Sequence, residues 1–135
     1  MKMLMFQTSR FAWKSFSKTL DDVPDQEADE AVAEALVVFL HAEEHDPDNP
    51  KLETKMVKHI KWLANKRDMK RVVLHSFTHL SESTAPPEFA KGLMDNLQSR
   101  LEKTDYQVWQ TSFGYFSSWD LSVYGESLAK VFKSL

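Results

Sequence analysis

The sequence of 135 residues contains no cysteine and only three glycines. The absence of cysteine excludes a disulfide framework and a thiolate zinc site, and it fits a cytoplasmic protein. Three glycines are too few for a glycine-rich phosphate-binding loop. No apolar run approaches the roughly 20 residues of a membrane span, and the opening residues 1–6 reach the polar Gln7 too soon for a secretion signal. We therefore expect a cytoplasmic protein with no membrane partner.

The composition is typical of one globular domain. Hydrophobic residues make up 42% of the chain and charged residues 27%, which is enough apolar material for a single core at this length. No repeat, low-complexity tract or linker interrupts the sequence, so residues 1–135 are predicted to form one domain. A net charge of −3 argues against a uniformly basic nucleic-acid binder.

Positive charge is missing from one stretch and concentrated in the next. Residues 21–48 contain no lysine or arginine, whereas residues 51–71 contain many and only two acids, Glu53 and Asp68. Such a segment can steer an anionic partner to one face of the molecule, and the alternative is a solvated helix surface. The candidate contacts in this segment are Lys55, Lys58, Lys66 and Arg67.

Hydrophobic periodicity predicts a mixed α/β domain, with a β-sheet on which helices pack. We expect strands at residues 2–8, 11–18, about 33–44, 71–76, 106–111 and 115–123. Helices are expected at about 51–67, from Pro86-Pro87 through Leu101, and at 127–135. The first two strands are predicted to pair as a hairpin within a three-stranded meander, and the exposed edges of that hairpin would allow a homodimer.

The histidines offer few candidate ligands or catalytic groups. His41 and His45 are four residues apart, but on the expected strand they would lie about 13 Å from each other, so we predict no metal site and no cofactor. His59 is expected on the helix surface, and His75 is expected to pack or hydrogen-bond within the sheet. His79 follows a strand, where its imidazole could hydrogen-bond a substrate or orient water.

Two short segments follow strand signals and are expected to meet side by side. They are Phe77-Thr78-His79-Leu80-Ser81 and Phe113-Gly114-Tyr115-Phe116-Ser117. The pair resembles the N-terminal editing domain of archaeal threonyl-tRNA synthetases, which has Phe-Ala-His-Leu-Ser and Phe-Gly-Tyr-Tyr-Lys at these places. Residues 36–40 and 46–50 match a strand and its exit loop in that family, so the resemblance covers nearly the whole chain.

The resemblance implies a D-aminoacyl-tRNA deacylase-like fold and hydrolysis of a mischarged seryl-tRNA ester, here acting in trans. A threonyl enzyme needs such a second site because one methyl group gives only about 1–3 kcal/mol of discrimination. The implied partners are the aminoacylated 3′ end of tRNA and a threonyl-tRNA synthetase, with the basic segment 51–71 contacting RNA. The implied catalytic residues are His79 and Ser117. The implied substrate-binding residues are Ala42, Phe77, Phe113, Gly114, Tyr115 and Phe116.

The sequence departs from this family where the family has charged groups. Ser117 replaces the family lysine, Lys130 stands at a family glutamate, and Gln7 stands at a histidine. Loss of one electrostatic donor typically lowers a rate by on the order of 10²–10³. Editing is therefore expected to be weak, altered or absent. The alternatives are a tRNA-binding or synthetase-associated module without catalysis, and a small-molecule binding domain.

Overall fold

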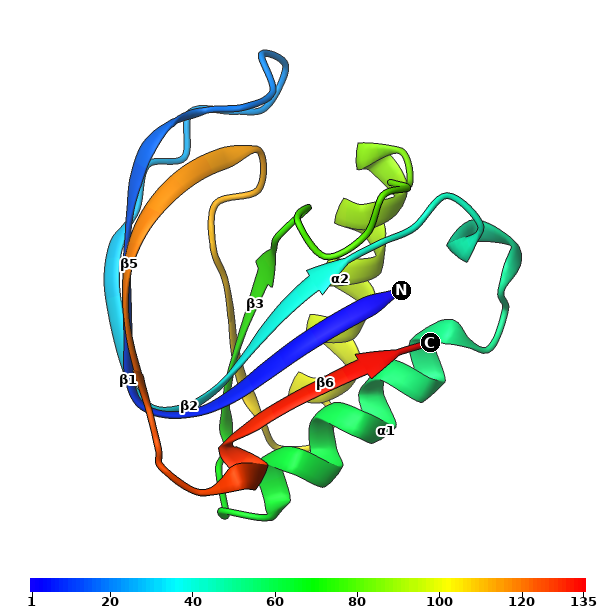
Figure 1. The fold of residues 1–135 in the computed structure, drawn as a ribbon. Coiled ribbons are helices and arrows are strands. Elements are labelled where there is room, and N and C mark those ends of the chain that lie inside the picture. Colours follow the sequence, from blue (N-terminus) through cyan, green and yellow to red (C-terminus); the bar gives the residue numbers. More distant parts are fainter.

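A computed structural model describes all residues from 1 to 135 (Figure 1). The prediction of a mixed α/β domain is confirmed. The strands are β1 (Lys2–Lys18), β2 (Asp29–His41), β3 (Arg71–Ser76), β4 (Gln107–Gln110), β5 (Tyr115–Val123) and β6 (Lys130–Ser134). The helices are α1 (Leu52–Asn65) and α2 (Pro87–Glu102), with single 3₁₀ turns at Asp46–Asp48 and Ser127–Ala129. Neither helix is long and apolar enough to cross a membrane.

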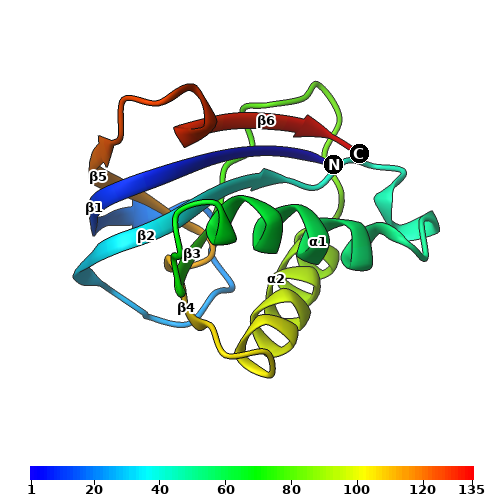
Figure 2. The same cartoon turned by 90° about the horizontal axis from the view of Figure 1, so that it is seen from below.

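The strands form one mixed sheet in the order β4-β3-β2-β1-β5, and β6 also pairs with β1. β2, β3 and β4 are parallel to one another, while β1 is antiparallel to β2, β5 and β6. α1 and α2 are the crossovers that parallel pairing requires, and both lie on the same face of the sheet (Figure 2). The carboxyl ends of β2, β3 and β4 consequently meet at one edge.

The predicted N-terminal hairpin and meander are wrong, because residues 2–18 form one continuous strand. The register of β1 against β5 shifts between Thr8 and Arg10, which marks a bulge at Ser9. On one side β1 pairs with β2 along most of its length. On the other side residues 2–6 pair with β6 and residues 8–18 with β5. Since β1 has neighbours on both sides, the exposed hairpin edge expected to support a homodimer does not exist.

The predicted C-terminal helix is also wrong. Only Ser127–Ala129 form a helical turn, and residues 130–134 form β6 against the start of β1. Val131 and Phe132 fit a short helical pattern as well as a strand, because a few apolar residues cannot distinguish the two periods. Along β6 the exposure of the side chains alternates, as expected of an edge strand with one solvated face.

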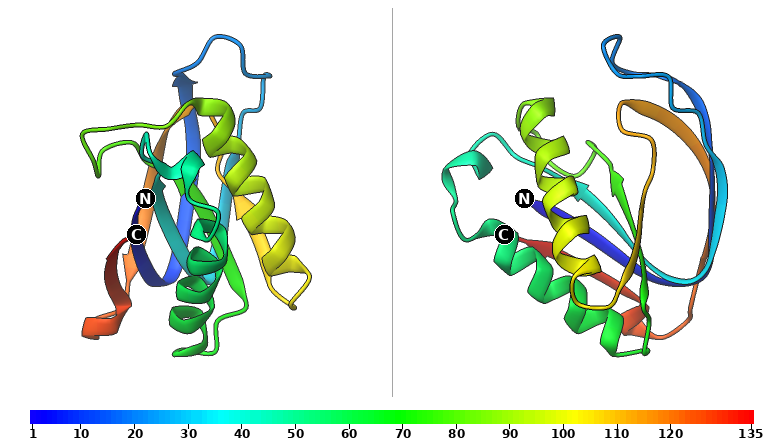
Figure 3. Two further views of the ribbon diagram at one scale, coloured as in Figure 1. Left: turned by 90° about the vertical axis from the view of Figure 1, so that its right-hand side faces the viewer. Right: turned by 180° about the vertical axis from the view of Figure 1, so that it is seen from behind.

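The sheet has a separate apolar cluster on each face. Met3, Leu36 and Leu74 point toward α1 and α2 and form the larger cluster with the buried sides of both helices. Phe11 and Phe39 belong to a smaller cluster on the other face. The far ends of β1, β2 and β5 curl away from the helices (Figure 3), and this curl covers the second cluster. The strong curvature follows from a long strand with two register shifts.

Candidate functional site

A cavity of about 420 Å³ lies beyond the carboxyl ends of the parallel strands β3 and β4. Open sheets with helical crossovers commonly bind ligands at such an edge. One wall comes from the segment after β3, with Phe77 and His79, and another from residues 113–117 at the start of β5. The beginning of α2, Thr19 and Leu20, Thr84 and Ala85, and Trp119 also contribute to the lining. The two segments that the sequence singles out therefore converge on one cavity.

Aromatic rings form much of the cavity wall. The ring centroid of Phe77 lies 4.9 Å from that of His79 and 6.1 Å from that of Trp119. Phe39, beneath them in the second apolar cluster, fixes Phe77 at 5.1 Å. His79 itself is exposed. Phe116 is 57% exposed and Trp119 39%, so both rings reach solvent rather than filling the cavity.

No aspartate, glutamate, lysine or arginine lines the cavity. His75 is one of its two histidines and is buried, with Nδ1 2.7 Å from the Thr111 hydroxyl. This pair confirms the expectation that His75 hydrogen-bonds within the sheet. Burial lowers the pKa of His75 to about 4, so its imidazole is neutral at pH 7. The chemistry available is thus that of hydroxyl, imidazole and backbone groups.

Ser117 lines this cavity, but its hydroxyl is buried in the wall and has no partner within the protein. Its Oγ is inaccessible to solvent and makes no hydrogen bond, although Ser117 lies beside the exposed Phe116. Buried hydroxyls are nearly always paired with protein or water. Because this oxygen is inaccessible in the observed rotamer, Ser117 reaches a ligand in the cavity only when its side chain rotates.

Gly114 is the position where the cavity wall requires glycine. Its φ angle of 79° lies in the left-handed region, and a Cβ atom would stand 2.7 Å from Val23 Cγ1. Its carbonyl accepts hydrogen bonds from the backbone N–H groups of Thr19, at 2.7 Å, and Leu20. Gly114 thereby joins the start of β5 to the β1–β2 connection and closes that side of the cavity.

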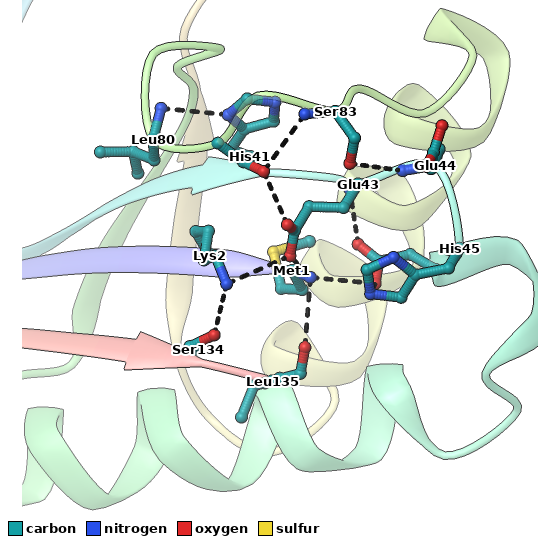
Figure 4. Close-up of polar contacts among 12 residues, drawn as sticks. Met1, Lys2, His41, Glu43, Glu44, His45, Leu80, Ser83, Ser134 and Leu135 are labelled. Atoms are coloured by element: carbon teal, nitrogen blue, oxygen red, sulfur yellow. Dashed lines mark hydrogen bonds and ion pairs between the residues drawn. The ribbon is translucent and has the colours of Figure 1, made fainter.

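The loop of residues 77–86, which carries His79, is held by two buried side chains from the end of β2 (Figure 4). The Leu80 backbone N–H donates to Nδ1 of His41 at 3.1 Å, so Nδ1 is unprotonated. The other nitrogen, Nε2–H, then donates to the Thr84 hydroxyl at 3.0 Å. Burial lowers the pKa of His41, which keeps this tautomer neutral. Sequence patterns did not indicate this role, because His41 ends an apolar strand run.

Glu43 fixes the same loop from a second point (Figure 4). The Ser81 hydroxyl donates to Glu43 Oε2 at 2.6 Å, and the other carboxylate oxygen accepts from the buried ammonium of Met1. Burial opposes ionisation of Glu43, but the hydrogen bonds from Met1 and Ser81 prevail and lower its pKa to about 2. Asp46 Oδ1 also binds the Met1 ammonium, at 2.9 Å.

His41 and His45 do not come together, and the carboxylates near them already have a cation. Glu43, His45 and Asp46 offer ligand atoms within 4.8 Å of one another. The Met1 ammonium forms ion pairs with the carboxylates of Glu43 and Asp46. His45 lies 3.8 Å from Asp46 on the solvent side. This cluster therefore holds the chain terminus.

Several residues singled out in the sequence lie away from the cavity. Ala42 is buried in the larger apolar cluster, and its carbonyl accepts from the Ala85 N–H at 2.9 Å. Lys130 begins β6 and donates to the Tyr124 carbonyl. Gln7 donates to the Leu63 carbonyl at 2.9 Å. Arg67 pairs with Glu126 and stacks 3.9 Å above the Tyr124 ring, so its charge is already engaged.

Comparison with known proteins identifies the family. The family model described as the archaea-specific editing domain of threonyl-tRNA synthetase matches residues 1–135. The chain belongs to this family. It is 30% identical to a threonine–tRNA ligase of Methanosphaera stadtmanae and 31% identical to that of Staphylothermus marinus, over its full length. The chain spans 22% of the length of each of these ligases.

A solved structure supports the fold class. The c-Myc DNA Unwinding Element Binding Protein superposes with a TM-score of 0.72, covering 100% of this chain and 99% of its own, at 14% identity. At such low identity the likeness concerns the fold alone. Together with membership of the editing-domain family, it confirms the predicted D-aminoacyl-tRNA deacylase-like fold.

Proposed function

We propose that this editing-family domain hydrolyses the ester that joins serine to the terminal ribose of a mischarged tRNA, acting in trans in the cytoplasm. The observation that carries the proposal is the convergence of Phe77, His79 and residues 113–117 on one cavity in a chain of this family. Its volume of about 420 Å³ falls in the usual range of about 300–1,000 Å³ for small-molecule sites. That space is suited to an aminoacyl ribose, with the rest of the tRNA outside.

The aromatic rim supports a nucleoside substrate. Phe116 and Trp119 present exposed rings at the cavity, and such rings bind nucleobases by stacking without regard to sequence. We place the terminal base of the tRNA against Phe116 and the aminoacyl ester deeper, between His79 and Gly114. No carboxylate lines the cavity, so the amino group of the substrate donates hydrogen bonds to backbone carbonyls and water there.

The chemistry we propose is modest and relies on neutral groups. The exposed imidazole of His79 orients the attacking water, and the unpaired Ser117 hydroxyl, after its side chain rotates toward the cavity, donates to the developing oxyanion. Water adds to the ester carbonyl, the bond to the ribose oxygen breaks, and that oxygen regains a proton to give serine and free tRNA. An aminoacyl ester is activated, which makes such weak assistance sufficient for a measurable rate.

A second candidate function is tRNA binding without catalysis. The absence of any charged side chain in the cavity favours it, because strong stabilisation of an oxyanion commonly uses a cation or several aligned donors. The partners of either function are tRNA and a threonyl-tRNA synthetase. A homodimer stays a prediction that sedimentation analysis of the purified chain can check.

Deacylation assays distinguish the two functions. We expect saturating protein to discharge seryl-tRNA faster than buffer does, and to discharge threonyl-tRNA more slowly than seryl-tRNA. His79→Ala should bring the seryl rate close to that of buffer. If wild-type protein binds tRNA but leaves the seryl rate at the buffer value, the non-catalytic function holds instead.

A further inference from the structure

A basic surface lies where side chains of α1 and β6, which are remote in sequence, approach each other around Trp62. The Nζ atoms of Lys66 on α1 and Lys133 on β6 each stand 5.8 Å from the ring centroid of Trp62. Lys58 and Lys133 also lie close enough to His59 to influence its charge. We call the five residues Lys58, His59, Trp62, Lys66 and Lys133 the α1–β6 surface.

The cations of this surface are not neutralised within the protein. Lys58, Lys66 and Lys133 make no ion pair. Glu53, the acid of α1, is paired with Arg100, at 3.2 Å. Burial, followed by the ammonium groups of Lys133 and Lys58, lowers the pKa of His59. A chain with net charge −3 thus keeps a concentrated positive surface, which attracts a polyanion.

Trp62 distinguishes this surface from an ordinary solvated helix face. Lysines are common on the outer side of a helix, but a tryptophan that is 41% exposed between two of them is not. Cations that bind phosphates, combined with an aromatic ring that stacks on a base, are the standard elements of single-stranded nucleic-acid recognition. An acidic protein partner would use the lysines but has no need of the ring.

The surface lies toward the end of the molecule opposite the cavity. α1 runs antiparallel to β2 and β3, so its last turn lies near the amino end of β3, while the cavity lies beyond the carboxyl end of β3 (Figure 1). A helix of 14 residues is about 21 Å long. A ligand that reached both places would have to extend along the domain, as a folded RNA does and a mononucleoside cannot.

We propose that the α1–β6 surface binds the body of the tRNA whose aminoacylated end enters the cavity. Lys58, Lys66 and Lys133 neutralise phosphates, and Trp62 stacks against an unpaired base or a ribose. The inference rests on the proposed tRNA substrate. Arg67 is not among the proposed RNA contacts, because it already pairs with Glu126 and stacks on Tyr124. Lys133 and Trp62 are RNA contacts that the sequence did not indicate. Lys133 lies near Trp62 because residues 130–134 form β6, a strand that sequence patterns did not predict.

The test compares two triple variants of equal charge. Lys58→Ala/Lys66→Ala/Lys133→Ala removes the surface, and Arg10→Ala/Lys14→Ala/Lys103→Ala removes three exposed basic residues outside the segment 51–71 that also make no ion pair. Filter binding of uncharged tRNA should show at least a tenfold loss of affinity for the first variant and less than a twofold loss for the control. The slope of log K against log salt should become shallower by about 2, as expected for loss of two or three phosphate contacts. Trp62→Leu should weaken binding roughly tenfold with the salt slope unchanged.

Equal losses in both triple variants would overturn the inference, because only net charge would then matter. An unchanged tRNA affinity together with lost binding to a purified threonyl-tRNA synthetase would overturn it in favour of a protein interface. A minimal substrate, seryl-adenosine, separates this inference from the proposed reaction. The surface variant should hydrolyse seryl-adenosine at the wild-type rate while losing activity on seryl-tRNA. If wild-type protein hydrolyses neither ester, but tRNA binding still depends on the surface, the reaction fails and the inference stands.

Discussion

The buried imidazole of His41 accepts a hydrogen bond from the backbone N–H of Leu80, 3.1 Å away, and so links the end of β2 to the residue that follows His79. His41 does not itself line the cavity, although it hydrogen-bonds Thr84, which does. Its contribution is positional, because it holds the loop that presents His79.

We predict that His41→Leu lowers the deacylation rate about tenfold or more by releasing this loop, whereas His41→Asn, whose Oδ1 can replace Nδ1, retains most of it. The measurement is the seryl-tRNA discharge rate at pH 7, accompanied by hydrogen exchange of the Leu80 amide. The exchange rate should rise for the leucine variant alone. Equal exchange in both variants would show that His41 does not hold the loop.

Ser117→Lys is expected to raise the rate of ester hydrolysis. An ammonium in a cavity without any charged side chain would stabilise the developing oxyanion, and the gain should be on the order of 10²-fold. Ser118→Lys is the matched control, since adjacent strand residues point to opposite faces and Ser118 does not line this cavity. If both variants change the rate equally, position 117 is not the limiting one.

Stability should fall as the pH drops from about 6.5 to about 4. His75 has a pKa near 4 when folded and near 6.5 when unfolded, so the unfolded state binds more protons in this window. The contribution is complete above pH 6.5, and its loss amounts to at most about 3 kcal/mol. Urea denaturation of His75→Asn, which can still hydrogen-bond Thr111, should show a smaller decrease between pH 7 and pH 4.5 than wild type. Identical decreases would exclude His75 as the titrating group.

Gly114→Ala should destabilise the protein by about 1–3 kcal/mol, through its left-handed backbone and the contact with Val23. Adding Val23→Ala should recover the steric part and leave the backbone part. Gly125→Ala serves as the control, because a Cβ there meets no atom within 4 Å. Thermal unfolding provides the measurement, and equal melting temperatures for the Gly114 and Gly125 variants would contradict the role given to Gly114.

Periodicity predicted the elements whose patterns are unambiguous. The strands 71–76 and 115–123 have the expected bounds, and both long helices begin and end within two residues of expectation. The third strand starts at Asp29 and ends at His41, earlier than predicted at both ends. Its start is set by pairing with residues 10–14 of β1, and its end by the turn at Glu43, whose backbone N–H donates to Asp46. Residues 9 and 10 look like a strand break because a bulge and a polar break have the same sequence signature.

The candidate site was only partly predictable. The family motifs identify the two converging segments, because those residues are adjacent in sequence. The groups that fix the loop, His41, Glu43 and the Met1 ammonium, come from distant parts of the chain. Local patterns in a single sequence do not reveal polar contacts between residues that are far apart in the chain. For the same reason they could not associate Lys133 with Trp62.

The most direct test of the proposed site is an experimental structure with a non-hydrolysable seryl-adenosine analogue. We expect the seryl group between His79 and Gly114, with a ligand oxygen or bound water on Ser117 Oγ and the adenine against Phe116. A ligand seated elsewhere, or an empty cavity at saturating analogue, would contradict the assignment of this cavity as the place where the ester is hydrolysed.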